Sequence, residues 1–150
     1  MCMFDYVPVA IATHTSAKAQ KGLANVPEPI VVSGLNQSVN FSCNSGAKPL
    51  AMCLWERDVS SRAETIVVDS QVEQEGGRIS KGVSYSGSGL QKGECGIRID
   101  ALKREDLGLW RCSLVTTGNH QALSGQVDVR LEERKYSRAL THTLRDHGDT

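Results

Sequence analysis

The side chains in this sequence that could act as nucleophiles, general bases or metal ligands are five cysteines and four histidines. They are Cys2, Cys43, Cys53, Cys95, Cys112, His14, His120, His142 and His147. A cysteine hydrolase needs a thiol, an imidazole and an orienting group in one pocket, and a structural zinc site usually contains cysteines roughly two to four residues apart. These cysteines are spaced too widely for such a pair, and the histidines are scattered. We therefore expect no catalysis, no metal and no cofactor.

Residues 105–112, EDLGLWRC, place Asp106, Gly108, Trp110 and Cys112 at alternate positions. Successive side chains of a β-strand point to opposite faces, so Trp110 and Cys112 should face the same way. The two earlier residues of the set then belong to the turn that leads into the strand. Taken alone, the pattern is also typical of an ordinary buried strand with a free thiol.

Short segments with alternating apolar and polar residues run from Pro29 to residue 132. They are PIVVS, SVNFSC, AMCLWER, TIVVD, RISKGVSY, CGIRIDAL, GLWRCSLV and GQVDVRL. Strand-length segments at short intervals, without a helical period, are typical of an all-β sandwich of two antiparallel sheets. We predict one domain over residues 29–132, an N-terminal linker or poorly ordered segment over 1–28, and a charged C-terminal stalk or tail over 133–150.

The charge and hydrophobicity of the chain argue against several classes of partner. Its 17 basic and 17 acidic residues cancel, so no basic surface for nucleic acid is indicated. Its apolar runs are far shorter than the roughly 20 residues that cross a bilayer as a helix, so we expect no direct membrane insertion. The first residues are not typical of a secretory signal, because Asp5 lies where a cationic segment should be and Pro8 interrupts the apolar run.

Three features together resemble the immunoglobulin superfamily. Cys43 ends one strand-like segment, Trp55 lies in the next, and Asp106 begins an Asp-x-Gly-x-aromatic-x-Cys motif. In that family the motif leads into strand F, a disulfide joins strands B and F across two sheets, and a strand C tryptophan packs against it. The resemblance implies an immunoglobulin-like Greek-key sandwich with a Cys43–Cys112 disulfide and with Trp55 and Trp110 in the core. The long interval between these cysteines resembles the variable type, and CLW, ECGIRI and GLWRC resemble invertebrate cell-surface members.

The resemblance also implies contacts at the start of strand F. Variable-type domains carry an arginine that pairs with the aspartate of the motif, and Arg78 stands at its place relative to Asp106; a solvated arginine at a strand end is the alternative. Trp110 stands where the family usually has a tyrosine whose hydroxyl bonds to nearby backbone. Because an indole N–H donates but cannot accept a hydrogen bond, we expect this corner to be looser or bonded differently.

Two further cysteines fall on faces that should point inward. Cys53 lies two residues before Trp55, and Cys95 alternates in phase with Ile97 and Ile99. Strands C and E of the family belong to opposite sheets, so Cys53 and Cys95 are candidates for a second disulfide between the sheets. Two separate buried thiols are the alternative. Cys2 is left without a partner in either case.

Two Asn-x-Ser sequons begin at Asn36 and Asn40. Asn40 alternates out of phase with Phe41 and Cys43, so its side chain should face solvent. We expect glycans on these asparagines if the chain enters the secretory pathway, although two sites this close need not both be filled. The sequons and the disulfides of the resemblance indicate an extracellular or cell-surface location, with no signal or anchor evident in the chain.

These features favour a binding module, namely an extracellular recognition or adhesion domain whose partner is a protein, either a second copy or a different chain. A secreted soluble immune or decoy protein is the alternative. In variable-type domains strands C, C′, F and G often present the binding face. Alternation points Leu54, Glu56, Arg111, Ser113 and Val115 outward, and a loop over residues 116–125 carries His120 and Leu123 near its tip. Apolar and charged side chains mix in this way at interfaces, although scattered exposed apolar residues are also normal on monomers.

Overall fold

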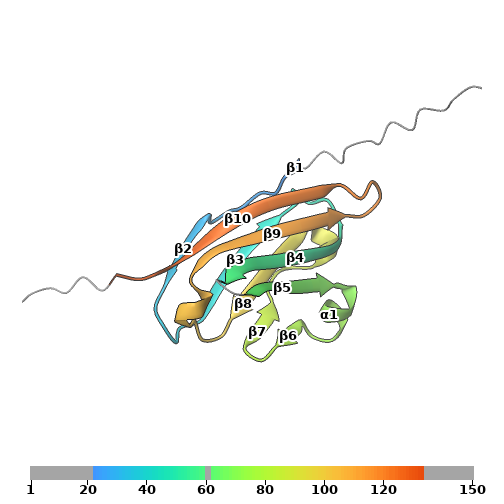
Figure 1. The fold of residues 1–150 in the computed structure, drawn as a ribbon. Helices are drawn as coiled ribbons and strands as arrows, with labels where there is room; N and C mark the ends of the chain where they lie inside the picture. The colour runs from blue at the N-terminus through green and yellow to red at the C-terminus, as the bar shows by residue number, and fades with distance from the viewer. Residues whose placement is uncertain (1–21, 60–61, 134–150) are drawn as a thin grey trace, which may run out of the picture.

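The computed structural model describes residues 22–59 and 62–133. Over this range the chain forms a six-stranded sheet A and a four-stranded sheet B, packed face to face (Figure 1). Sheet A contains β1 (Gly22–Leu23), β10 (Ala122–Leu131), β9 (Gly108–Thr116), β4 (Leu50–Val59) and β5 (Arg62–Asp69) in that order, with β2 (Ile30–Ser33) beside β10. Sheet B contains β3 (Val39–Asn44), β8 (Glu94–Ile99), β7 (Val83–Tyr85) and β6 (Arg78–Ser80). Short helices occupy three connections, α1 (Ser70–Gln74), η1 (Leu90–Lys92) and η2 (Arg104–Asp106).

The predicted all-β sandwich is therefore confirmed. The expected strands B and E are β3 and β8 of sheet B, whereas C, C′, F and G are β4, β5, β9 and β10 of sheet A. Consecutive partners in both sheets are antiparallel, and only β1 and β2 run parallel to their neighbour β10 among the strands that the structure describes. Four strands of the expected binding face thus share one sheet.

Period-two alternation explains why the strands form where the sequence predicts them. In β3 the side chains of Val39, Phe41 and Cys43 are buried, whereas those of Asn40 and Ser42 are exposed. A β-strand with one apolar and one polar face buries the apolar face against the opposite sheet, and slipping by one residue would reverse every side chain. The hydrophobic pattern therefore fixes both the strand and its register.

Aromatic side chains fill the centre of the core. Trp55 is completely buried, and its ring meets that of Phe41 edge to face, with centroids 5.1 Å apart and planes at 86°. The ring of Trp110 also packs against that of Phe41, with centroids 5.2 Å apart. Such pairs add about 0.5–1.5 kcal/mol each to the stabilisation that comes from burying their area. The predicted core positions of Trp55 and Trp110 are confirmed.

Two disulfides join the sheets. Cys43 of β3 is bonded to Cys112 of β9, with Cα atoms 6.8 Å apart, and Cys53 of β4 is bonded to Cys95 of β8, with Cα atoms 6.2 Å apart. Both predicted pairings are present. Cys43 and Cys95 lie directly opposite each other in the β3–β8 ladder, so the two bridges cross the core side by side. Cys2 and the rest of residues 1–21 lie outside the described residues.

Next to these bridges the core leaves no room for a side chain at Gly125 of β10. A Cβ atom at this position would lie 2.6 Å from Cγ2 of Val26 and 3.1 Å from Sγ of Cys112. Glycine is thus needed here for the close approach of β10 to the Cys112 sulfur.

The segment RISKGVSY is two strands, not the single one predicted. Strands β6 and β7 form a tight antiparallel hairpin in which Arg78 pairs with Ser84. The chain reverses at Gly82, whose φ of +78° is a conformation that glycine adopts without strain. A Lys-Gly turn inside an alternating segment was the signal for this hairpin.

The domain also begins earlier than the predicted boundary at residue 29. Strand β1 pairs with β10, and Asn25 exchanges backbone hydrogen bonds with Asn44 of β3. Backbone pairing leaves no signature in side-chain alternation over so few residues, which is why composition alone indicated a linker. The C-terminal tail beyond Glu133 lies outside the described residues.

Candidate functional site

The outward side chains of β10, β9, β4 and β5 form one continuous surface, here called the sheet A face. The cross-strand register sets its rows, because directly opposed residues of a sheet point to the same side. One row contains Ser113, Leu54 and Val67, and the next contains Arg111, Glu56 and Thr65. A third row pairs Val115 with Met52. The sheet A face therefore brings together the five strand residues that the sequence nominated, Leu54, Glu56, Arg111, Ser113 and Val115.

The centre of the sheet A face is apolar. Leu54 and Val67 lie directly opposite each other on neighbouring strands, and Val67 is 42% exposed. Met52 and Val115 continue this patch into the next row, and both are partly exposed. The charged pair Arg111 and Glu56 borders the patch on the other side. Sequence reasoning missed Val67, although its alternation with the buried Ile66 and Val68 was readable.

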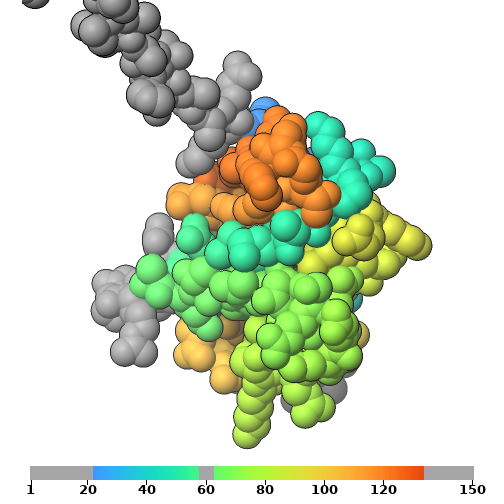
Figure 2. Space-filling view, turned by 90° about the vertical axis from the view of Figure 1, so that its right-hand side faces the viewer, coloured from blue at the N-terminus to red at the C-terminus, as the bar shows by residue number. Residues whose placement is uncertain are grey.

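The turn between β9 and β10 borders the sheet A face at one end of the sandwich. Figure 2 looks at this end, where the turn (orange) stands beside the connection from β3 to β4 (teal). The Thr117 amide donates to the Pro49 carbonyl, 2.9 Å away, which ties the two loops together. Within the turn, the Gln121 amide donates to Thr116 Oγ1 at 3.1 Å. His120 is exposed here with a φ of +50°.

The predicted position of Leu123 at the loop tip is wrong. Strand β9 extends to Thr116 and β10 begins at Ala122, so the loop is shorter than residues 116–125. Leu123 lies opposite Leu114 in the ladder and is only 6% exposed. It shares the inward phase of Val127, a relation that period-two counting back from the core would have found.

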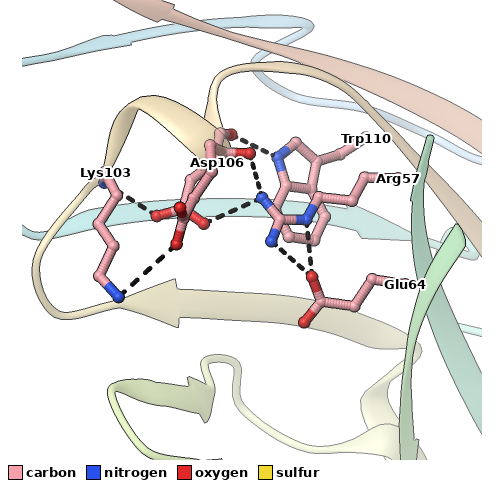
Figure 3. Close-up of polar contacts among 6 residues, drawn as sticks. Arg57, Glu64, Lys103, Asp106 and Trp110 are labelled. Atoms are coloured by element: carbon pink, nitrogen blue, oxygen red, sulfur yellow. Dashed lines mark hydrogen bonds and ion pairs between the residues drawn. The ribbon is translucent and has the colours of Figure 1, made fainter. Parts of the chain in front are cut away.

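A polar cluster surrounds Arg57, near the end of β4 that lies away from the β9–β10 turn (Figure 3). The Arg57 guanidinium donates to Asp106 Oδ1 at 3.0 Å and to Glu64 Oε2 at 2.8 Å, and it also donates to the Glu105 carbonyl. Its carbon Cζ lies 5.0 Å from the ring centroid of Trp110, within the range of a cation–π contact. The other oxygen of Asp106 accepts from the Lys103 amide at 2.9 Å. Arg57 therefore connects the edge of sheet A to the turn before β9.

The predicted pair between Arg78 and Asp106 is wrong, because Asp106 pairs with Arg57. The side chains of Arg57 and Asp106 are 12% and 14% exposed, so the ion pair is largely removed from water. Arg78 instead begins β6, the edge strand of sheet B, and its side chain is exposed. Val83 of β7 lies opposite Ile99 at the end of β8. Because Arg78 belongs to β6, on the far side of β7, it is one strand further from β8 than the prediction required.

The Trp110 side chain makes the type of bond that the tyrosine of this corner makes, so the expectation of a looser or differently bonded corner is not met. Its indole Nε1 donates to the backbone carbonyl of Asp106, 2.9 Å away. The bond thus reaches the same kind of acceptor as the tyrosine hydroxyl would, four residues upstream.

The sequence analysis missed Arg57. This residue alternates in phase with the buried Trp55, and a cation that points inward requires an anionic partner, so the sequence did contain a signal for it.

The structure also locates the remaining candidates for chemistry. The four described cysteines are all oxidised, so none of them is a thiol that His120 could activate. Asn40 is exposed on the outer side of β3, and Asn36 is exposed in the turn before it. Within the described range, the helices are too short and too polar to cross a membrane.

Comparison with known proteins places the fold. No family model matches the sequence, and no curated protein matches it. Matches among solved structures are numerous, 1855 chains in all, and include murine CRIg. The CRIg structure superposes with a TM-score of 0.55 and 18% sequence identity, over 73% of this chain and 97% of that chain. Together with the two sheets and the bridge between β3 and β9, this likeness shows that the chain folds as an immunoglobulin-like sandwich.

Proposed function

We propose that this chain is an extracellular protein-recognition module, of the kind used in cell adhesion, and that the sheet A face binds its protein partner. The observation that carries the proposal is the apolar patch of Leu54, Val67, Val115 and Met52 with Arg111 and Glu56 at its border. An apolar centre with a polar rim is the arrangement found at specific protein interfaces.

The covalent chemistry of the core supports the extracellular part of this proposal. Disulfides persist in oxidising environments and are rare in the cytosol. Two of them cross this small core, Cys43–Cys112 and Cys53–Cys95. Immunoglobulin-like sandwiches are typically non-catalytic, which also fits a binding role.

A second copy of the chain is the simplest partner that the sheet A face fits. Arg111 and Glu56 lie opposite each other on β9 and β4. A two-fold axis running along the strands midway between β9 and β4 places Arg111 of each copy over Glu56 of the other, as an isologous interface requires. The same axis places Met52 of each copy over Val115 of the other and Leu54 over Ser113, so part of the apolar patch lies in this interface. Homophilic binding is therefore the first form of the proposal to test.

The test replaces single apolar residues of the patch by aspartate. Leu54→Asp and Val115→Asp should each weaken binding by at least about 30-fold, because a charge without a partner would be buried at the centre of the interface. Binding is measured by sedimentation equilibrium for self-association and by staining of intact animal cells with the tetramerised domain.

The matched control is Val32→Asp on β2, since Val32 is 57% exposed on the same sheet but outside the patch. It should leave binding unchanged. The melting temperatures of all three variants should stay close to that of the parent. Binding that persists in both patch variants, or a loss that accompanies unfolding, would contradict the proposal.

A further inference from the structure

The outer face of sheet B differs in chemistry from the sheet A face. Its central ladder pairs Asn40 with Arg98, Ser42 with Gly96 and Asn44 with Glu94, so no apolar side chain of β3 or β8 points outward. A polar surface of this kind lacks the apolar centre that a protein interface uses.

A trough runs along this polar face. It has a volume of about 380 Å³, with Asn40, Ser42 and Asn44 of β3 along its floor. Pro27, Glu28, Ser86 and Gly87 also line it, together with Glu94, which lies opposite Asn44 in the ladder. The Ser86 amide donates to the Gly96 carbonyl at 2.9 Å, which fixes Ser86 to the sheet.

The floor of the trough includes the acceptor asparagine of a sequon. Asn40, Phe41 and Ser42 form an Asn-x-Ser sequence, and alternation along β3 places Asn40 and Ser42 on the outer side while Phe41 is buried. A glycan on Asn40 is therefore compatible with the folded strand, and it would begin at one end of the trough.

We propose that Asn40 carries an N-linked glycan whose first sugars lie in the trough. In its formation, Asn40 Nδ2 forms a bond to the anomeric carbon of an oligosaccharide held on a polyprenyl diphosphate. The sugar–phosphate bond breaks, the diphosphate leaves with the lipid, and the amide loses one proton. This inference rests on the proposed function only in that the chain must enter the secretory pathway.

The side chains along the trough suit the hydroxyl and acetamido groups of a core sugar. Ser42 and Asn44 offer donors and acceptors, and Glu28 and Glu94 offer carboxylate acceptors. The Ser88 amide and hydroxyl both donate to Glu94 Oε2, at 2.7 and 2.8 Å. These bonds to the carboxylate lower the pKa of Glu94. A seated glycan covers the outer side of β3 and leaves the sheet A face open.

The first experiment measures occupancy of the site. The full chain is expressed in animal cells behind a cleavable signal peptide, as Asn36→Gln and as Asn36→Gln with Asn40→Gln. The intact mass of the secreted single variant should include an oligosaccharide, and that of the double variant should not. A secreted single variant without sugar overturns the proposal. Binding by the sheet A face is measured in a separate experiment, so the glycan proposal and the proposed binding function can be contradicted independently.

The second experiment measures seating in the trough. In the Asn36→Gln background, the amidase that hydrolyses the sugar–asparagine bond should release the glycan slowly from native protein. Adding Glu28→Ala should speed release about tenfold, equivalent to about 1.4 kcal/mol of lost contact. The control Glu132→Ala, an exposed glutamate outside the trough, should not. Equal release rates for these three proteins overturn the seating of the glycan.

Discussion

Arg57 stabilises the turn before β9 through one guanidinium group. It bonds to Asp106, Glu64 and the Glu105 carbonyl, and it covers the Trp110 ring. A charge this far from water is favourable only while its partners remain in place, because removing one leaves the other uncompensated. The residue that the sequence did not single out is thus the one that organises the corner.

Replacing Arg57 by methionine should lower the free energy of unfolding by about 2 kcal/mol, because Asp106 then keeps its charge without its main partner. Urea unfolding followed by tryptophan fluorescence measures the loss. The control Arg98→Met removes a pair whose side chains are 48% and 62% exposed, so it should change stability by less than about 0.5 kcal/mol. Equal effects of the two substitutions would contradict this role for Arg57.

At the scale of elements, the sequence predicted the strands that have one buried and one solvated face. Cys43 and Trp110 could be assigned to the core because each belongs to an alternating run that one sheet buries. Side-chain patterns carried less information about where strands begin and end when turns or backbone pairing set those limits. The reversal at Gly82 divides a segment that alternates throughout, and β1 pairs over only two residues.

The candidate site was predictable to a similar extent. Leu54 and Val115 could be placed on one face, because parity along a strand determines the side on which a residue lies. The length of the β9–β10 turn depends on hydrogen bonds such as that of Gln121 to Thr116, which the sequence does not reveal. The inward phase of Leu123 was readable from Val127, and Leu123 was misplaced because the loop was taken to extend to residue 125. Arg78 was misassigned because its position depended on a family resemblance and not on contacts of this chain.

The contact between β10 and the segment before β2 gives a test at the element scale. Gly125→Ala should cost about 1–3 kcal/mol of stability, because its Cβ would overlap Val26. Combining it with Val26→Ala removes the overlapping methyl groups. The cost of the double variant should therefore be smaller than the sum of the two single costs, as measured in a double-mutant cycle by urea unfolding. Simple additivity would show that the overlap is relieved elsewhere.

The whole molecule is a sandwich with two chemically different outer faces. Sheet A presents Leu54, Val67 and Val115, whereas the β3–β8 ladder of sheet B presents only polar groups. The two disulfides hold these faces at a fixed separation, since each joins one strand of each sheet. The apolar patch and the polar ladder therefore lie on opposite sides of one core.

The two bridges should act on the unfolded chain as a coupled pair. The Cys43–Cys112 bridge spans 69 residues and contributes about 4 kcal/mol in the chain-entropy model. Once it has formed, the loop left for Cys53 and Cys95 to close is smaller. Replacing all four cysteines by alanine should therefore cost more than the sum of the two pairwise replacements. Urea unfolding of the three variants measures the three costs. A fourfold cost equal to the sum of the two pairwise costs would show that the bridges act independently.

The parallel pairing of β2 with β10 has a mechanical consequence. Tension on the flanking chain pulls the start of β2 and the end of β10 in opposite directions. Bonds such as Asp128 N to the Pro29 carbonyl and Glu132 N to the Ser33 carbonyl are then loaded together in shear, not one after another as in unzipping. Once these hydrogen bonds have broken, the Cys43–Cys112 disulfide prevents the chain between its two cysteines from being extended. Parallel pairing of the first long strand with the last therefore makes the sandwich resist tension applied along the chain.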